Sequence, residues 1–367
     1  MKRTKKFLVG LLAALSVLCG SLGLAGCDEK GEKGDTGANG VGIEKVEYDE
    51  NGDLKITFTD GTTQTVEMPA TESSSPIEAG ATENLHYQKI ASKEEYRVIG
   101  LGLAGENDIV ISSTYKGLPV TSIGDRAFFG CVNLTSVNIP DGVTSIGDMA
   151  FYNCSNLTSI TIPDSVTSIG YNAFSGCGSL NYNVNDNLKY LGNEQNPYLY
   201  LVGVLDTSIT SATIENTCKW IGESAFSNCD SLTSITIPDS VTSIGNSAFE
   251  DCSSLTSIEI PDGVTSIGNY VFYNCTSLTS IEIPDSVTTI GDSAFRDCSS
   301  LTSIEIPDGV TSIGNSAFYG CSRLTSIEIP DNVTSIGYNA FSGCSSLTSI
   351  INLIQAEILF EELKLQL

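Results

Sequence analysis

The sequence predicts an α/β repeat fold: a solenoid with a ladder of parallel strands on one face and short helices or turns on the other, preceded by a small β-meander. The first observation is a 23-residue unit, clearest at residues 301–323, which read LTSIEIPDGVTSIGNSAFYGCSR. A period of this length is typical of a solenoid. The second is that Ile304 and Ile306 alternate with Ser303 and Glu305, as in a strand with one buried face. Because no unit can bury its apolar face alone, stability must come from stacking.

The second half of each unit is expected to turn and then to form a short helix. Residues 307–309 end the strand, since proline has no amide donor and glycine accepts a positive φ. Asn315 and its equivalents stand where a short helix needs an N-cap. The buried face of that helix would be Ala317, Phe318 and Cys321.

Residues 1–26 are expected to be an export signal and not part of the fold. They have a basic start, an apolar run and the small residues that precede a cleavage site. The sequence Leu-Ala-Gly-Cys at residues 24–27 resembles the lipobox of bacterial lipoproteins. That resemblance implies cleavage before Cys27 and a lipid on its sulfur. The alternative is an ordinary cleaved signal, which would leave a fully soluble protein.

Residues 27–42 form the lipidated start and a short collagen-like spacer. Glycine recurs at every third position from Gly31 to Gly40, with no proline between. Four such triplets are too few to hold a triple helix alone. The segment is therefore a flexible spacer or, as the alternative, the remnant of a trimerising stalk; the sequence leaves open whether the chain is a monomer or a trimer.

Three further segments lead into the repeats. Residues 43–68 alternate between apolar and polar side chains, and the turn dipeptides Asn-Gly and Asp-Gly interrupt them, which predicts a three-stranded β-meander. Residues 69–84 are rich in Ser, Thr, Glu and Pro and form a linker. Residues 85–108 are expected to form an N-terminal cap. Together with a strand at 109–111, this cap would cover the first edge of the solenoid, because an open strand edge promotes aggregation.

The repeats run over residues 109–350, and one unit is atypical. Residues 180–208 are longer than the other units and predict a hairpin that protrudes from its coil. Its tyrosines form either an exposed recognition patch or a set of side chains packed on adjacent coils. The candidate patch consists of Tyr190, Tyr198 and Tyr200. Residues 351–367 have a helical apolar pattern and are a C-terminal cap or a tail.

Nine cysteines share one repeat position, of which Cys321 is an example, and a tenth, Cys218, replaces a valine. Disulfides between neighbouring coils are one interpretation for an exported chain. A ladder of identical positions does not pair off naturally, and nine is an odd number. We therefore favour burial of these thiols as small apolar side chains.

The charge balance limits the partners. The full chain has a net charge of −26, and the predicted signal would remove only basic residues, so the mature chain is more acidic still. Nucleic acid and anionic membrane surfaces are therefore excluded as partners, apart from the membrane contact of the lipid anchor. Basic proteins remain candidate ligands, and divalent cations are a further candidate.

The consensus I-x-I-P-x-x-V-x-x-I-G-x-x-A-F-x-x-C, which recurs through about ten units, resembles the BspA-like leucine-rich repeat. It departs from the commoner leucine-rich pattern because residues 308–310 include no asparagine or cysteine for the usual asparagine ladder. The resemblance implies a leucine-rich-repeat solenoid and an adhesin-like surface lipoprotein of bacteria. It also implies an extracytoplasmic, lipid-anchored location at the cell surface, and host matrix proteins or proteins of other cells as partners.

One row of outward strand positions is the candidate binding face. Stacked coils place its side chains about 4.8 Å apart, and four successive glutamates repel one another unless cations or a basic partner relieve the charge. We expect this acidic, serine-lined strip to be concave and to bind the ligand; the alternative is a solvated row that keeps the array soluble. The strip comprises Asn138, Thr161, Thr236, Glu259, Glu282, Glu305 and Glu328, with Ser257, Ser280, Ser303 and Ser326 beside them.

The sequence gives little support for an enzyme. Its one histidine, His86, lies outside the repeats, so the array holds no Ser-His-Asp or Cys-His site and no multi-histidine metal site. The aspartates that follow the repeat prolines are explained by turn formation. We expect no catalytic residue, no metal site and no cofactor. The chain is then a surface binding module or, as the alternative, a structural spacer of the cell envelope without a specific ligand.

Overall fold

The computed structural model describes residues 43–48, 54–58, 61, 63–66, 80–102 and 106–352. The chain divides into two compact units, Met1–Ile77 and Glu78–Leu367. The predicted signal, the lipidation site Cys27, the collagen-like spacer and the tail after residue 352 lie outside the described residues, as does most of the linker.

The first unit contains three strands in the segment where a meander is predicted. They are β1 (Ile43–Tyr48), β2 (Leu54–Phe58) and β3 (Thr63–Val66). β1 pairs antiparallel with β2, and β2 pairs antiparallel with β3, in the order of the chain. The Asn-Gly and Asp-Gly dipeptides fall between these strands.

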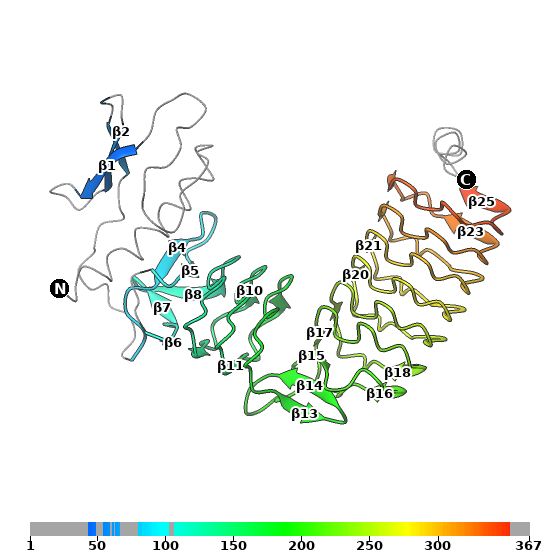
Figure 1. Ribbon diagram of the computed structural model, residues 1–367, viewed down its shortest axis with the longest axis horizontal. Coiled ribbons are helices and arrows are strands. Elements are labelled where there is room, and N and C mark those ends of the chain that lie inside the picture. Colours follow the sequence, from blue (N-terminus) through cyan, green and yellow to red (C-terminus); the bar gives the residue numbers. More distant parts are fainter. Residues whose placement is uncertain are drawn as a thin grey trace. The chain divides into compact units, whose positions relative to one another are not determined.

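The second unit is a stack of coils joined by parallel strands (Figure 1). We call the strands at the I-x-I part of each repeat the first ladder. They are β6 (Asp108–Val110), β9 (Ser136–Asn138), β11 (Ser159–Thr161), β16 (Ser211–Thr213), β18 (Ser234–Thr236), β23 (Ser326–Ile329) and β25 (Ser349–Asn352). Each pairing joins positions 23 residues apart within the regular units, as in Ile327 with Ile350. The predicted register of neighbouring units is therefore confirmed.

A second ladder, which the sequence analysis did not predict, runs along the Thr-Ser-Ile-Gly part of each repeat. Its strands are β8 (Leu118–Ile123), β10 (Ser145–Ile146), β12 (Ser168–Ile169), β17 (Trp220–Ile221), β19 (Ser243–Ile244), β20 (Ser266–Ile267), β21 (Thr289–Ile290), β22 (Ser312–Ile313) and β24 (Ser335–Ile336). The isoleucines align in register here too, as Ile290 does with Ile267 and Ile313. Where both ladders are formed, each coil is thus held to the next on two edges.

Extra strands occupy the N-terminal end of the second ladder. They are β4 (His86–Lys89), β5 (Tyr96–Gly100) and β7 (Thr114–Tyr115). β4 pairs antiparallel with β5, β5 runs parallel to β8, and β7 pairs antiparallel with β8. β4 therefore ends this sheet, at the edge that the predicted cap was expected to cover.

The prediction of short helices is wrong for the part of the chain that the structure describes, where the segments after the second ladder are turns. The reason is visible at Asn315 and Ser316. Asn315 does not cap a helix, because its Oδ1 accepts a hydrogen bond from the amide of Tyr338 in the next coil at 2.8 Å. Ser316 has a φ of 54°, in the left-handed region that a right-handed helix excludes. The predicted inward residues Ala317, Phe318 and Cys321 are nevertheless buried.

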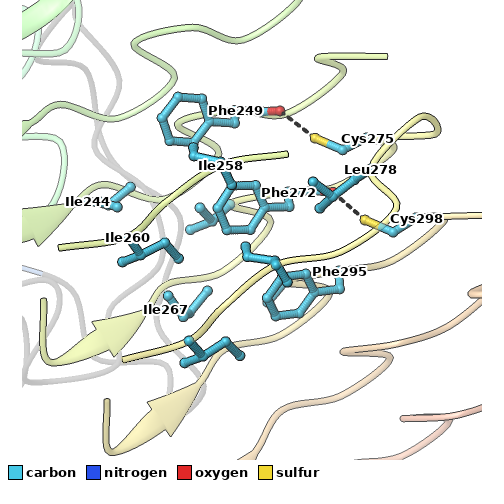
Figure 2. Close-up of a cluster of buried hydrophobic side chains, with 14 of the residues drawn as sticks. Ile244, Phe249, Ile258, Ile260, Ile267, Phe272, Cys275, Leu278, Phe295 and Cys298 are labelled. Carbon is cyan, nitrogen blue, oxygen red and sulfur yellow. Dashed lines mark hydrogen bonds between the residues drawn. The ribbon is translucent and has the colours of Figure 1, made fainter. Parts of the chain in front are cut away.

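The core consists of identical side chains stacked on one another. Phe249, Phe272 and Phe295 lie nearly parallel, with ring centroids 5.6 and 5.4 Å apart (Figure 2). The thiol of Cys275 donates to the carbonyl of Phe249 at 3.1 Å, and that of Cys298 donates to Phe272 in the same way. The described cysteines are free thiols, and all except Cys131 are buried, so the structure supports burial and not disulfides.

The atypical unit does not protrude, contrary to the sequence-based expectation. Its strands are β13 (Asn183–Asn185), β14 (Leu188–Leu191) and β15 (Tyr200–Val204). β14 and β15 pair antiparallel as a hairpin, but β15 also runs parallel to β17 and so belongs to the stack. Leu188, Tyr190 and Leu201 are fully buried in the core.

The glycine that follows each second-ladder strand lets successive coils approach closely. A Cβ on Gly291 would lie 2.6 Å from the carbonyl carbon of Gly268 and 2.7 Å from the amide nitrogen of Asn269, both in the preceding coil. These are backbone atoms and cannot rotate away. The amide of Gly291 also donates to the carbonyl of Ile267 at 2.8 Å, which fixes the two coils at this distance.

Replacement of Gly291 by alanine is therefore expected to destabilise the array by about 1–3 kcal/mol, the usual cost of an overpacked interior. Gly178→Ala is the matched control, since a Cβ there meets nothing within 4 Å. Urea unfolding followed by circular dichroism measures both. Equal midpoints for the two variants would contradict the close-approach argument.

Candidate binding surfaces

The outward row of the first ladder is exposed to solvent. The glutamate row, by which we mean Glu259, Glu282, Glu305 and Glu328, is exposed throughout, while the alternating isoleucines are buried. The other predicted members, Asn138, Thr161 and Thr236, are also exposed, as are Ser257, Ser280, Ser303 and Ser326. The structure thus brings the predicted side chains onto one edge of the stack.

Backbone pairing in the first ladder weakens where the glutamates are stacked. Ser234–Thr236 pairs over three residues with the preceding coil. In contrast, Glu259 and Glu282 share only an isolated parallel bridge, and residues 301–306 carry no strand. Like charges directly opposite each other on neighbouring strands are destabilising, which agrees with this interruption. The core below is unaffected, because Ile304 and Ile306 stay buried.

A shallow hollow of about 370 Å³ follows the second ladder, on a different edge of the coil from the glutamate row. Its floor and walls are the short side chains and glycines of four successive coils, among them Thr289, Gly291, Ser312, Gly314 and Ser335. This hollow therefore lies along the second ladder and not along the glutamate row, which is the predicted binding face.

The predicted aromatic patch is not formed as an exposed surface. Tyr190 is fully buried and Tyr200 is 9 % exposed, whereas Tyr198 is partly buried and meets Tyr190 edge-on at 5.3 Å. The hydroxyl of Tyr190 accepts a hydrogen bond from the amide of Glu215. These contacts favour the packing alternative, because they tie the hairpin to the next coil.

The atypical unit creates a hollow that sequence reasoning missed. We call it the seam hollow; it has a volume of about 250 Å³ and is lined by Phe174, Cys177, Tyr182, Tyr200 and Glu223, among others. It lies where the stack of phenylalanine rings is interrupted, since Tyr200 meets Phe174 edge-on at 5.7 Å in place of the parallel stacking seen elsewhere. Two hydrophobic clusters of the core meet at this point.

Glu223 is the polar group that distinguishes the seam hollow. The pKa of its carboxyl is raised from 4.5 to about 7. Burial is the main cause and the charge of Asp148 adds to it, while a hydrogen bond from the amide of Asn172 acts in the opposite direction. In the sequence, this site is marked only by one residue that differs from the repeat pattern. Glutamate follows Ile-Gly at position 223, where the other units have Asp, Asn or Tyr.

Most of the repeat thiols are poor nucleophiles. The exceptions are Cys177 and Cys344, whose pKa is lowered by a hydrogen bond with the thiol of Cys154 and of Cys321, respectively. Burial raises the pKa of Cys229 to about 11 and that of Cys275 to about 12. A thiol with so high a pKa is almost entirely protonated at neutral pH, and the thiolate is the reactive form. The cysteines with a raised pKa therefore serve packing and carbonyl hydrogen bonding.

The described residues contain no group of three or more His, Cys, Asp or Glu side chains arranged to hold a metal ion. None of these residues belongs to a helix with the length and apolar character that crossing a membrane requires.

Comparison with known proteins identifies the repeat. The sequence profile of the BspA type leucine rich repeat region matches in six copies, over residues 118–195, 205–299 and 265–358. No curated protein matches the sequence.

Several solved structures resemble the chain. A leucine-rich repeat protein from Bacteroides ovatus is 34 % identical over 75 % of this chain and 71 % of its own, with a TM-score of 0.41. A leucine rich cell surface protein from Faecalibacterium prausnitzii is 27 % identical over 76 % of this chain and 96 % of its own, with a TM-score of 0.30. The pneumococcal vaccine antigen PcpA is 17 % identical over 85 % of this chain and 99 % of its own, with a TM-score of 0.37.

The raised pKa of Glu223 makes the stability of the array depend on pH. The folded state binds the proton more tightly than the unfolded state, so this contribution to stability is fully present below about pH 4.5 and is lost as the pH rises towards 7. Glu223→Gln, which mimics the protonated form, should therefore unfold at a higher temperature than the wild type at pH 8 and at nearly the same temperature at pH 5. Thermal unfolding at the two pH values measures the difference in unfolding temperature. Glu250→Gln is the control for the loss of one charge, because Glu250 lies on a turn outside the hollow. A constant difference between Glu223→Gln and the wild type would contradict it.

Proposed function

The chain belongs to the BspA-type leucine-rich repeat family, and from that premise we propose that it is a protein-binding, adhesin-like protein of the cell surface. One observation carries the proposal: the first ladder presents the same acidic side chain, flanked by serine, in four successive coils, and every one of these glutamates is exposed. A partner that bridges several coils meets the same chemistry at each step of the stack. The likeness to a cell surface protein of Faecalibacterium prausnitzii supports the location.

Binding fits the chemistry of this surface better than catalysis does. The one histidine of the sequence, His86, lies on β4 outside the repeats. The repeats themselves have no histidine to activate a serine or cysteine, and buried thiols with raised pKa values do not supply a nucleophile. A row of exposed, evenly spaced carboxylates is instead suited to hold a basic partner through long-range attraction and many weak contacts.

The partner class that this row fits is a protein with a basic surface, displayed by a host matrix or by another cell. The alternative is a spacer of the envelope that binds nothing and uses its charge for solubility. The two differ in a measurable way, since a spacer gives no saturable binding to immobilised matrix proteins such as fibronectin or fibrinogen.

Reversal of two charges in the row tests the proposed face. Glu282→Lys together with Glu305→Lys should weaken binding to the captured matrix protein at least tenfold, since like charges then face the basic partner. Surface plasmon resonance with the mature chain from Asp28 onward measures the change. Glu194→Lys with Asp230→Lys is the control, because both residues are exposed, lie outside the glutamate row and alter the net charge equally. Equal losses for the two double variants would assign the effect to net charge and remove the row as the binding face.

The proposed location includes a lipid anchor on Cys27. In a bacterium that processes lipoproteins, the wild-type chain should partition into the detergent phase of a Triton X-114 extraction, because a diacylglyceryl group adds a large apolar surface. Cys27→Ala should leave the protein in the aqueous phase, with Cys19→Ala as the control. Mass spectrometry of the N-terminal peptide shows whether Cys27 carries the lipid. A wild-type protein found only in the aqueous phase would support an ordinary cleaved signal instead.

A further inference from the structure

The seam hollow differs from every regular interval of the array because its side chains do not repeat. Phe174 ends one run of stacked phenylalanines and Phe226 begins the next, and Tyr200 stands between them. The hydroxyl of Tyr200 lies beside Gly222, because a Cβ built on that glycine would be 2.8 Å from the hydroxyl oxygen. The hydroxyl is therefore close to the backbone of the next residue, Glu223. The result is a hollow of about 250 Å³ with aromatic walls and a carboxylate.

Among the residues that the structure describes, no cationic side chain forms an ion pair with the carboxylate of Glu223. Where a regular unit has Asp or Asn at this position, that side chain accepts a hydrogen bond from the next coil, as Asn269 does from the amide of Asp292 at 2.8 Å. Glu223 instead accepts from the amide of Asn172, and the charge that acts on it is the like charge of Asp148. Within the described residues no lysine, arginine or histidine pairs with Glu223. A half-buried carboxylate held without a cation costs stability, and such costs are characteristic of binding sites.

The walls of the hollow suit the alkyl chain and the charge of an amine. Aromatic rings attract cations over their faces, and the ring of Tyr182 already does so, since Lys189 Nζ lies 5.4 Å from its centroid. Phe174 adds an apolar surface, and Tyr200 lines the same hollow as Glu223. The volume is below that of a pocket for a drug-sized molecule, so the hollow fits a short side chain or a small amine.

We propose that the seam hollow is a binding site for an alkylammonium group. The ammonium pairs with the Glu223 carboxylate, and the alkyl chain lies against Phe174 and Tyr182. The group comes either from a free amine or from a lysine side chain of a partner protein. The site is separate from the glutamate row, so this proposal can be tested independently of the binding face proposed above.

The test uses the mature chain at pH 8, where Glu223 is ionised, and three probes in isothermal titration or ligand-observed NMR. n-Butylamine represents the free amine, N-acetyl-lysine methylamide represents a lysine in a protein, and N-acetyl-norleucine methylamide is the uncharged control. We expect the charged probes to bind and the uncharged control to bind at least tenfold more weakly, because the bond to the carboxylate is lost. Binding of both charged probes assigns the site to lysine side chains; binding of n-butylamine alone assigns it to free amines.

Two variants locate the binding. Glu223→Gln should weaken binding of the charged probe about tenfold or more, and Tyr182→Leu should weaken it by a smaller factor, because it removes the ring and keeps an apolar wall. Glu250→Gln is the matched control and should bind as the wild type does. Circular dichroism confirms that each variant is folded. The proposal is overturned if neither amine binds, if the norleucine probe binds as well as the lysine probe, or if folded Glu223→Gln retains full affinity.

Discussion

The close approach of each coil to the next at the Ile-Gly corner is the constraint on which the rest of the array depends. The amide of Gly314 donates to the carbonyl of Ile290, and that of Gly337 to Ile313, both at 2.8 Å, and a Cβ on either glycine would meet the backbone of the preceding coil. Because the corner is fixed, each position of a unit lies directly next to the equivalent position of the following coil. The rings therefore stack, the thiols reach the carbonyls of the preceding coil, and one outward glutamate becomes a row. The surface chemistry of the array is thus a consequence of its backbone spacing.

The atypical unit shows what happens when this constraint is relaxed. Residues 180–208 replace one regular turn by a hairpin, and the ring that continues the stack is Tyr200, edge-on to Phe174. The mismatch is not filled by a repeating side chain, so space remains, and the neighbouring coil supplies Glu223 to line it. A regular interval can only produce rows of identical groups. A set of different groups that converge on one point, as a specific ligand requires, can arise only at such an irregularity.

The sequence predicted what periodicity controls and missed what depends on local geometry. The alternation of Ile304 and Ile306 with polar residues correctly gave the buried face, and the 23-residue period correctly gave the coil step and the register. The helix prediction failed because Ala317, Phe318 and Cys321 have a spacing that a helix and a tight turn share, and the positive φ of Ser316 decides between them. The second ladder was missed because two-residue strands are too short to show alternation. Tyr190 and Tyr200 were candidates for an exposed patch because the hairpin signal says nothing of what covers it.

The two acidic features act over different ranges, and this difference governs how a basic partner would meet the protein. The glutamate row lies in water, where its attraction extends across about a Debye length and is screened by salt. Glu223 is half-buried beside aromatic rings, where attraction is stronger but reaches only a group that enters the hollow. The row would therefore favour encounter with any cationic surface, while the proposed site in the hollow would select for a single ammonium of the right length. Attraction by the row alone would give weak, salt-sensitive and unselective adhesion, and the proposed ammonium site would add the selectivity that the row lacks.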